Sequence, residues 1–326
     1  MRLTLAIPVH NDRDNLIALL RTVGRLGFAD RVVVVDDGSD IPLDADALCA
    51  AAALPRAMVQ LLRHDTSTGP GVARNRALSE VETDHLLYLD SDDLPTRDLA
   101  PLLRDLTDQA FDFCLFQHHD TRMDQELAWG QMPWDQTHWH RAGVALGALN
   151  PVNPAAAAHL AHTANYPWNK IYRTAFLRDN AIGCSDIRLH EDIELHWRSF
   201  LAARHILASD RIGVVHVFHP HGTRMTNRTD HERLAVFGPL QRIAGELESD
   251  TGKNRVYAGS FFAFTLGLFD WICNNLHREH QAQFARLVQE FQTTHIPPEM
   301  LERLTRTDPN LIKRLKRHLP PDQTGG

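Results

Sequence analysis

Cysteine is scarce in this sequence: 326 residues include only four, and these lie far apart in the chain. They are Cys49, Cys114, Cys184 and Cys273. None belongs to a Cys-x-x-Cys pair, the spacing that is typical of zinc ribbons and redox centres. The spacing therefore argues against a disulfide framework or a zinc knuckle, and it favours a reduced chain in the cytoplasm.

Positive charge is not in excess, because 34 Lys and Arg residues are outnumbered by 41 Asp and Glu residues, giving a net charge of -7. This balance argues against a general nucleic-acid binder, so we predict no nucleic-acid partner. The sequence begins directly with the strand-like residues 3–7, without a charged and then apolar leader. We therefore expect no secretory signal.

Long hydrophobic runs are absent as well. The most apolar stretch, 257–273, is interrupted by Asp270, and its uninterrupted part is shorter than the ~20 residues that cross a bilayer. We predict a buried helix there. The sequence also lacks a Gly-x-x-x-x-Gly-Lys-Ser/Thr motif and a Gly-rich loop after the first predicted strand. These absences exclude a P-loop NTPase and weaken a dinucleotide-binding interpretation.

Apolar runs alternate with amphipathic stretches over the first 117 residues. The predicted strands are 3–9, 31–35, 58–63, 85–89 and 111–117. The predicted helices between them are 14–26, 43–53, 71–80 and 95–110. Continuous apolar strands separated by helices predict an α/β fold, with a mostly parallel sheet that is flanked by helices on both faces.

The pattern becomes less regular beyond residue 117. The predicted elements are an irregular connection at 129–154, an ordered segment at 166–179, a helix at 191–203, a strand at 212–219, and helices from about 230 onward. The last residues, 320–326, are predicted to be disordered. A connection as long as 129–154 inside a compact domain is often functional, and this one is rich in Trp and His.

One predicted strand runs directly into a cluster of acids, Asp90-Ser91-Asp92-Asp93. The carboxyl end of a buried strand is the usual ligand crevice of an open α/β sheet. Carboxylates this close repel one another unless a cation or a proton intervenes. Two oxygen ligands in an Asp-x-Asp spacing suit Mg²⁺ or Mn²⁺ bound to a diphosphate. The alternative is a solvated acidic turn that caps the next helix.

Polar residues also follow the first two predicted strands, at Pro8-Val9-His10-Asn11 and Asp36-Asp37-Gly38-Ser39. Acids at a strand end can accept hydrogen bonds from a ribose hydroxyl or a base imide. Gly38 permits a turn with positive φ and a close approach of a ligand. The alternative is a simple turn with a helix cap.

A third motif, Gly71-Val72-Ala73-Arg74-Asn75, opens a predicted helix just before the acidic strand. The guanidinium of Arg74 could reach an acid or a phosphate. A helix N-terminus with a surface arginine is the alternative.

Taken in order, these motifs resemble those of the family 2 glycosyltransferases, which have the GT-A fold. The residues that carry the resemblance are Ile7-Pro8-Val9-His10-Asn11, Val35-Asp36-Asp37-Gly38-Ser39, Gly71-Val72-Ala73-Arg74-Asn75, Asp90-Ser91-Asp92-Asp93, Trp168-Asn169-Lys170-Ile171-Tyr172 and His190-Glu191-Asp192. The resemblance implies a Rossmann-like GT-A domain at 1–225, with a nucleotide-sugar half at 1–117 and an acceptor half at 118–225. The remainder, 226–326, is expected to form a helical C-terminal extension.

The resemblance implies a nucleotide-sugar site and a metal site. The implied nucleotide-sugar residues are Pro8, Val9, Asn11, Asp36, Asp37, Arg74, Asp90 and Ser91. Asp92 is implied as the direct ligand of Mn²⁺ or Mg²⁺, with Asp90 closer to the ribose and His221 as a third ligand. A surface loop with unremarkable histidines is the alternative for the segment around His221.

The resemblance also implies a catalytic base. Asp192 matches the base of the inverting enzymes and would deprotonate the acceptor hydroxyl, while Glu191 would orient the acceptor. Favourable pairing of both acids with a helix dipole is the alternative. Lys170 is expected near the acceptor and Arg224 near the diphosphate.

The expected reaction is transfer of a sugar from a UDP-sugar to a growing glycan or a lipid-linked saccharide, as in the biosynthesis of a surface polysaccharide. The segment 311–319 has apolar residues at helical spacing with cations between them, a pattern that is typical of a helix on anionic lipid. We expect a cytoplasmic protein with peripheral contact to the inner face of the membrane. A solvated helix that packs on the domain is the alternative for 311–319.

Three other functions compete with this hypothesis. A sugar nucleotidyltransferase would show a Gly-rich basic loop after the first strand, which Pro8-Val9-His10-Asn11 lacks. A non-catalytic scaffold or glycan-binding relative would not need intact acids at 90, 92 and 192. A glycosidase also uses two carboxylates but needs no nucleoside pocket. The Trp- and His-rich segment 129–140 contains none of the motifs that carry the resemblance, and we expect it to shape the acceptor site.

Overall fold

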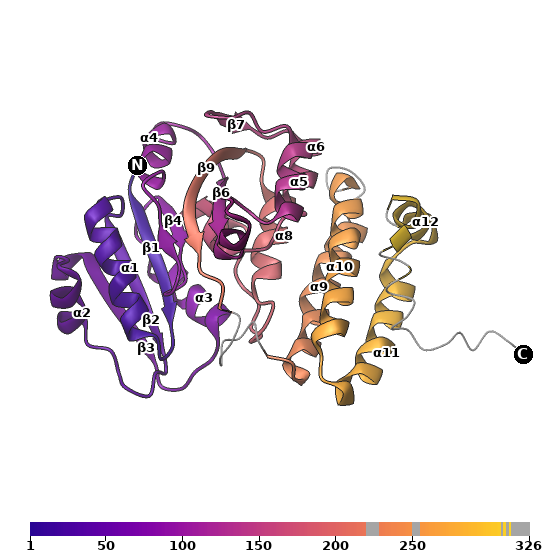
Figure 1. The fold of residues 1–326 in the computed structure, drawn as a ribbon, viewed down its shortest axis with the longest axis horizontal. Coiled ribbons are helices and arrows are strands. Elements are labelled where there is room, and N and C mark those ends of the chain that lie inside the picture. Colours follow the sequence, from indigo (N-terminus) through magenta and orange to yellow (C-terminus); the bar gives the residue numbers. More distant parts are fainter. Residues whose placement is uncertain (220–227, 250–254, 308, 311–312, 314–326) are drawn as a thin grey trace, which may run out of the picture. The chain divides into compact units, whose positions relative to one another are not determined.

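The computed structural model describes residues 1–219, 228–249, 255–307, 309–310 and 313. The chain divides into two compact units, Met1–His219 and Pro220–Gly326, which are described here one at a time (Figure 1). The predicted domain boundary at 225 lies outside the described residues and stays a prediction.

The first half of unit 1 is a parallel sheet in the order β3-β2-β1-β4. The strands are β1 (Leu3–Val9), β2 (Arg31–Asp37), β3 (Val59–His64) and β4 (His85–Tyr88). The helices between them are α1 (Arg13–Leu26), α2 (Ala45–Ala52) and α3 (Pro70–Glu80). The predicted alternation of strands and helices is confirmed, and Figure 1 shows it at the indigo end of the ribbon.

Every residue of β1 is buried, because helices cover both faces of the sheet. Successive side chains of a strand point to opposite faces. Leu5 and Ile7 join the core cluster that contains the apolar faces of α1 and α2, whereas Ala6 points to the face that α3 covers. This double coverage explains why the strand is an unbroken apolar run.

The second half of unit 1 continues the sheet in the order β8-β6-β9-β5. Its strands are β5 (Leu94–Pro95), β6 (Phe113–Asp120), β7 (Leu149–Pro151), β8 (Lys170–Arg173) and β9 (Ile206–His216). β8 is antiparallel to both β4 and β6, and β9 is parallel to β6. The helices are α4 (Leu99–Asp105), α5 (Pro133–Ala142), α6 (Pro154–Leu160), α7 (Thr174–Asp179) and α8 (Asp192–Ala202).

Two expectations for this half were wrong. The stretch 129–154 is not an irregular connection, because it contains α5 and β7. Pro133 sets the first φ of α5, but α5 buries only Asp135 and Trp139, so its periodicity is weak. The late strand begins at Ile206 rather than at 212, since residues 206–209 are buried beside β6.

Unit 2 is helical over its described residues, as predicted. Its elements are the short helix η5 (His231–Val236), α9 (Phe237–Ser249), α10 (Arg255–Asn275), α11 (Arg278–His295) and α12 (Pro298–Thr307). In Figure 1, α9, α10 and α11 run side by side. Phe269 of α10 packs edge-to-face on Phe284 and Phe291 of α11.

The apolar helix α10 is long enough, by length and composition, to cross a membrane. Its buried residues include Phe261, Leu266, Phe269 and Ile272. These residues recur at helical spacing, so the prediction of a buried helix holds for one side of α10, and 44% of its apolar stretch is buried within the structure.

Candidate functional site

The sheet brings the ends of β1, β2 and β4 to one edge. Val9 pairs with Asp36 across β1 and β2, and Ala6 pairs with Tyr88 across β1 and β4. Because these strands are parallel, the segments that follow Val9, Asp37 and Tyr88 lie along the same carboxyl edge of the sheet. The predicted nucleotide-sugar motifs therefore meet in space, as their order in the sequence suggested.

Asp36, at the end of β2, is fully buried. It accepts hydrogen bonds from the backbone N–H of Ser39 at 2.9 Å and of Leu43 at 3.2 Å, and it forms an ion pair with Arg63. Burial alone would raise the pKa of Asp36, but these donors outweigh it and hold the pKa below its ordinary value. Asp36 thus fixes the shape of the turn after β2.

Asp37 is similarly surrounded by donors. The backbone N–H groups of Thr68 and Gly69 lie 2.9 and 2.8 Å from its oxygens, and His64 Nδ1 lies 2.7 Å away. Burial acts to raise the pKa of Asp37, but these hydrogen bonds lower it to about 2. The carboxylate therefore ties the end of β2 to the loop that leads into α3.

Gly38 has a φ of 68°, in the left-handed region that favours glycine. A Cβ at this position would lie 2.5 Å from the backbone N of Ser67. The close approach that glycine permits here is thus to a neighbouring loop of the protein. His10 donates from Nδ1 to the carbonyl oxygen of Asp37 at 2.8 Å, and the backbone N–H of Asn11 donates to Ser39 Oγ at 2.9 Å. These bonds fasten the end of β1 to the same turn.

The four residues that follow β4 have different environments. The side chain of Asp90 is 31% exposed and that of Asp92 is 15% exposed, so these two carboxylates reach the surface of the edge. Ser91 is buried and donates to Asp12 Oδ2 at 2.8 Å. Asp93 is buried and accepts from His216 Nδ1 at 3.0 Å and from the backbone N–H of Val217 at 2.9 Å.

Arg74 connects this edge to the start of α8. It is buried, and its guanidinium donates to Asp90 Oδ1 at 2.5 Å and to Glu191 Oε1 at 2.7 Å. Burial would lower the pKa of Arg74, but the charges of Asp90 and Glu191 raise it well above its ordinary value. Arg74 was predicted to reach an acid or a phosphate, and in the structure it reaches two acids.

Gly71 permits this connection. A Cβ on Gly71 would lie 2.6 Å from the carbonyl oxygen of Ser185 and 2.8 Å from Glu191 Cβ. Only glycine therefore lets the N-terminus of α3 approach the 185–191 loop closely enough for Arg74 to reach Glu191. The loop itself is closed by a hydrogen bond from the backbone N–H of Ser185 to the carbonyl oxygen of Glu191 at 2.8 Å.

Asp192 occupies the first turn of α8, next to Glu191. Burial, and then the negative charge of Glu191, raise the pKa of Asp192 above its ordinary value, while Arg74 and Lys170 act in the opposite direction. A carboxyl group with a raised pKa exchanges its proton close to neutral pH, the range in which general acid–base groups act.

Lys170 begins β8 and is fully buried. Its ammonium donates to the carbonyl oxygen of Tyr166 at 2.8 Å and to Asn169 Oδ1 at 2.7 Å. Burial lowers the pKa of Lys170 to about 7, although the charge of Asp192 acts to raise it. Lys170 thus acts on Asp192 from the interior, and its predicted contact with an acceptor stays a prediction.

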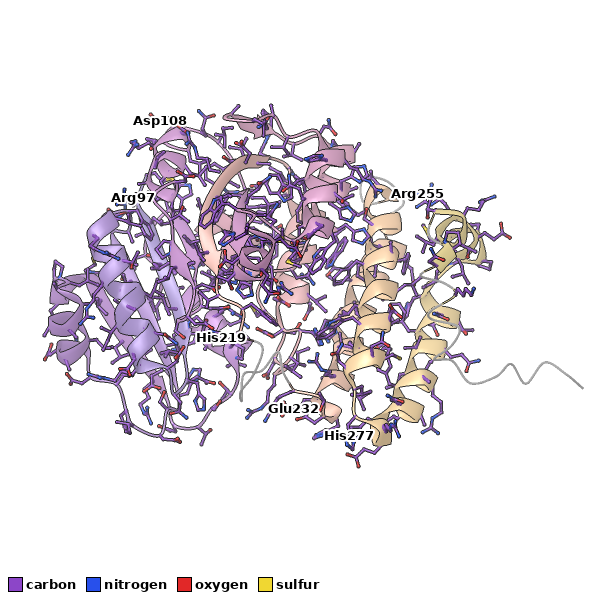
Figure 2. The ribbon with its side chains drawn as sticks, viewed as in Figure 1. Arg97, Asp108, His219, Glu232, Arg255 and His277 are labelled. Carbon is purple, nitrogen blue, oxygen red and sulfur yellow. The ribbon has the colours of Figure 1, made fainter. Side chains whose placement is uncertain are left out.

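The donors suited to a divalent cation gather where β4 and β9 end. His219 Nε2 lies 3.4 Å from Asp92 Oδ2, and Figure 2 labels His219 just beyond the end of β9. A carboxylate and an imidazole are ligand types that Mn²⁺ accepts. Within the described ranges no three His, Cys, Asp or Glu side chains form a metal-binding group. The predicted third ligand, His221, lies outside those ranges, as do Arg224 and all of 311–319 except Lys313.

Sequence reasoning missed the contact between Asp93 and His216. The two residues are 123 positions apart, and β9 delivers His216 to the acidic edge. Trp168 stacks on the ring of His216 with the ring centres 5.1 Å apart. The clustering of His216 and His219 at the end of the last strand was a usable signal, but the sequence pattern pointed only to His221 and Arg224 in that segment.

Comparison with known proteins adds a family match. Residues 4–158 match the family model of "Glycosyl transferase family 2". A pre-mycofactocin glycosyltransferase from Mycobacterium tuberculosis is 30% identical over 199 residues, which cover 60% of this chain and 38% of that protein. The match thus spans little more than a third of the length of this curated relative.

Solved structures resemble the chain over nearly its whole length. TarS 1–349 from S. aureus, in complex with UDP-GlcNAc, has a TM-score of 0.74 at 20% identity, covering 98% of this chain and 90% of that one. The mannosyltransferase PcManGT from Pyrobaculum calidifontis, in complex with GDP-Man and Mn²⁺, has a TM-score of 0.54 at 15% identity, covering 97% and 84%. At these identities the likeness shows the fold, which confirms the predicted GT-A architecture with its helical C-terminal part.

Proposed function

Because residues 4–158 match the family 2 glycosyltransferase model, we propose that the protein is an inverting, metal-assisted glycosyltransferase with Asp192 as its base. The donor is a nucleotide-sugar, most simply a UDP-sugar. The acceptor is a growing glycan or a lipid-linked saccharide, as in polysaccharide biosynthesis. We further propose a cytoplasmic location, with peripheral membrane contact through 311–319.

The observation that carries this proposal is the bridge made by Arg74. Asp90 belongs to the donor half of the domain and Glu191 to the acceptor half, and the two are 101 positions apart in the sequence. One buried guanidinium binds both, at 2.5 and 2.7 Å. A direct transfer needs the donor and the base to be held in one geometry, and this shared contact fixes the two halves together.

The chemistry assigned to Asp192 is general-base catalysis. The acceptor hydroxyl oxygen attacks the anomeric carbon of the donor sugar, and its proton passes to a carboxylate oxygen of Asp192. A new C–O bond forms as the bond from the anomeric carbon to the diphosphate oxygen breaks, and the nucleoside diphosphate leaves. Attack from the side opposite the leaving group inverts the anomeric configuration. The raised pKa of Asp192 supports this role.

Asp92, together with Asp90, is proposed to hold Mn²⁺ or Mg²⁺, which would neutralise the charge that develops on the departing diphosphate. Carboxylate oxygens are ligands that these ions prefer, and Mg²⁺ is commonly bound by one or two carboxylates together with substrate phosphates and water. His219 Nε2 lies 3.4 Å from Asp92 Oδ2 beside this pair, and the predicted third ligand, His221, lies outside the described residues.

The base assignment predicts that Asp192→Asn lowers turnover by roughly a hundredfold or more, while donor binding is retained. Asp92→Asn is expected to remove the metal-dependent part of donor binding. The matched control is Asp186→Asn, an exposed carboxylate of the neighbouring loop, which should change neither quantity. The measurements are release of nucleoside diphosphate and the thermal shift that the nucleotide produces.

The same product assay separates the competing reactions. Release of nucleoside diphosphate means glycosyl transfer, whereas release of pyrophosphate means nucleotidyl transfer. A normal transfer rate for Asp192→Asn would refute the base assignment. Donor binding without turnover on any acceptor would favour the non-catalytic alternative.

A further inference from the structure

Two tryptophans project from the part of unit 1 that follows β6. Trp129 is 63% exposed and Trp134, in α5, is 51% exposed, although an indole is usually largely buried. Most surface apolar residues need no explanation when they occur singly, but two indoles within six residues of one segment, each fixed by a side chain from the end of β6 or the turn after it, indicate an interaction site. Each ring is also held in one position by a neighbouring side chain, His119 for Trp129 and Arg122 for Trp134.

Trp129 is held by His119, one residue before the end of β6. The two rings stack with their centres 3.9 Å apart and an angle of 18° between their planes. The backbone N–H of Gly130 donates to His119 Nδ1 at 3.1 Å, so the imidazole proton is on Nε2, which lies 2.9 Å from Asp124 Oδ1. His119 is thereby locked, and one face of the Trp129 indole is fixed on it.

Trp134 is held by Arg122. The guanidinium lies 5.6 Å from the centre of the Trp134 ring and 4.8 Å from the centre of the Phe218 ring. Arg122 is itself fixed by the buried Asp120, to which Nε and Nη2 donate at 2.8 and 2.5 Å. This is the bidentate geometry that gives an arginine a single orientation. Trp134, Arg122 and Phe218 therefore form a preformed stack at the end of β6, with the guanidinium of Arg122 against both rings.

This stack is continuous with the acidic edge. The backbone N–H of Phe218 donates to Thr121 Oγ1 at 2.9 Å, and the next residue, His219, lies 3.4 Å from Asp92. Asp120 pairs with His216 across β6 and β9, and His216 contacts Asp93. The same strand ends thus hold both the aromatic rings and the proposed metal site.

We propose that Trp129 and Trp134 form an acceptor platform, which binds a sugar ring of a saccharide acceptor by stacking. The inference rests on the proposed function and assigns the acceptor side of that site. A pyranose ring presents a face of C–H groups that packs on an indole, and hydroxyls around its edge that need polar partners. Arg122 lies over the Trp134 ring, and Asp124 is bound to His119, on which Trp129 stacks, so both supply polar atoms near the indoles.

The mixture of groups distinguishes a saccharide from an apolar chain. A lipid chain needs a continuous apolar surface, but this platform has an ion pair and a hydrogen-bonded histidine directly behind its rings. Flat aromatic surfaces with a few fixed polar groups are the usual composition of small-ligand sites. The rings are fixed before the ligand arrives, so binding orders no further side chains.

The test compares Trp129→Ala and Trp134→Ala with Leu127→Ala, which alters a 97% exposed apolar residue of the same loop. Each labelled protein is applied to a printed glycan array with nucleotide and Mn²⁺ present. We expect the wild type to bind a subset of glycans, each Trp variant to bind them about tenfold more weakly, and Leu127→Ala to bind them normally. Trp129→Phe and Trp134→Phe should restore part of the affinity.

The outcomes separate this inference from the proposed function. The rise in melting temperature that the nucleotide produces should be the same in the Trp variants and the wild type. If the variants lose this rise, the rings contribute to donor binding or to folding and not to acceptor binding. Unchanged array binding by both Trp variants overturns the platform, as does a wild type that binds nucleotide but no glycan.

Binding to anionic phospholipid vesicles that is lost in the same variants would assign the rings to a membrane instead. A wild type that binds no nucleotide contradicts the proposed function itself.

Discussion

At the scale of single residues, the carboxylates near the carboxyl edge of the sheet have different pKa values because their surroundings differ. Asp37 is buried among N–H and O–H donors, and its pKa falls to about 2. Asp192 is placed beside Glu191, and burial with that like charge raises its pKa. A carboxylate that is already satisfied by the protein has a structural role, whereas one with a raised pKa is suited to take up a proton.

The environment of Asp37 predicts an acid-dependent contribution to stability. A shift from 3.8 to about 2 corresponds to about 2 kcal/mol of unfolding free energy, since one pKa unit is worth about 1.4 kcal/mol. Because the folded pKa is the lower one, this contribution is present above about pH 4 and is lost as the pH falls towards 2. Asp37→Asn should therefore lower the melting temperature by roughly 4–8 °C at pH 7.

Melting curves recorded from pH 8 to pH 3 check this prediction. The difference between the wild type and Asp37→Asn should be constant above pH 5 and should shrink below pH 4. Asp40→Asn, at an exposed carboxylate of the same turn, is the control. A difference that grows on acidification would contradict the assignment.

At the scale of elements, the contact between α3 and the start of α8 decides whether the two halves of unit 1 share one site. α3 approaches the 185–191 loop through Gly71, where a Cβ would lie 2.6 Å from the carbonyl oxygen of Ser185. This approach places Arg74 between Asp90 and Glu191. The glycine and the arginine of one motif therefore act together, the first by its small size and the second by its charge.

The space around Gly71 in α3 and Gly245 in α9 predicts different effects of a Gly→Ala substitution on stability. Gly71→Ala should destabilise the protein by about 1–3 kcal/mol, because the new methyl group meets backbone that cannot move freely. Gly245→Ala in α9 meets no atom within 4 Å and should be neutral or stabilising by up to about 1 kcal/mol. Scanning calorimetry gives both values, and equal melting temperatures for the two variants would contradict the close contact.

Elements with a strong repeating pattern could be predicted from the sequence, and those fixed by distant partners could not. α1 has a regular apolar face, and β1 and β2 are continuous apolar runs, so their bounds were nearly right. α5 buries too few residues to reveal its period. The pairings of Arg74 with Glu191 and of Asp93 with His216 span more than a hundred positions, and no local pattern specifies them.

At the scale of the whole molecule, unit 1 is a sheet whose parallel half carries the motifs at 7–11, 35–39 and 90–93 and whose mixed half carries Asp192, the proposed base, and the two exposed tryptophans. β8 lies between β4 and β6 and is antiparallel to both, so it joins the two halves into a single sheet. The fold, and the match of residues 4–158 to the family 2 glycosyltransferase model, could be predicted from motifs whose order the sequence preserves. The sugar could not be predicted, because none of these motifs specifies it.

The central claim is that the carboxyl edge of this sheet binds a nucleoside diphosphate together with a divalent cation. The most direct test is the melting temperature of the protein with UDP, GDP, CMP or dTDP, each with and without Mn²⁺. A ligand that binds only the folded state stabilises it by about 2.7 kcal/mol at a hundred times its Kd. We predict a rise for UDP that requires Mn²⁺ and is lost in Asp92→Asn. No rise for any nucleotide, with or without the metal, would contradict the claim.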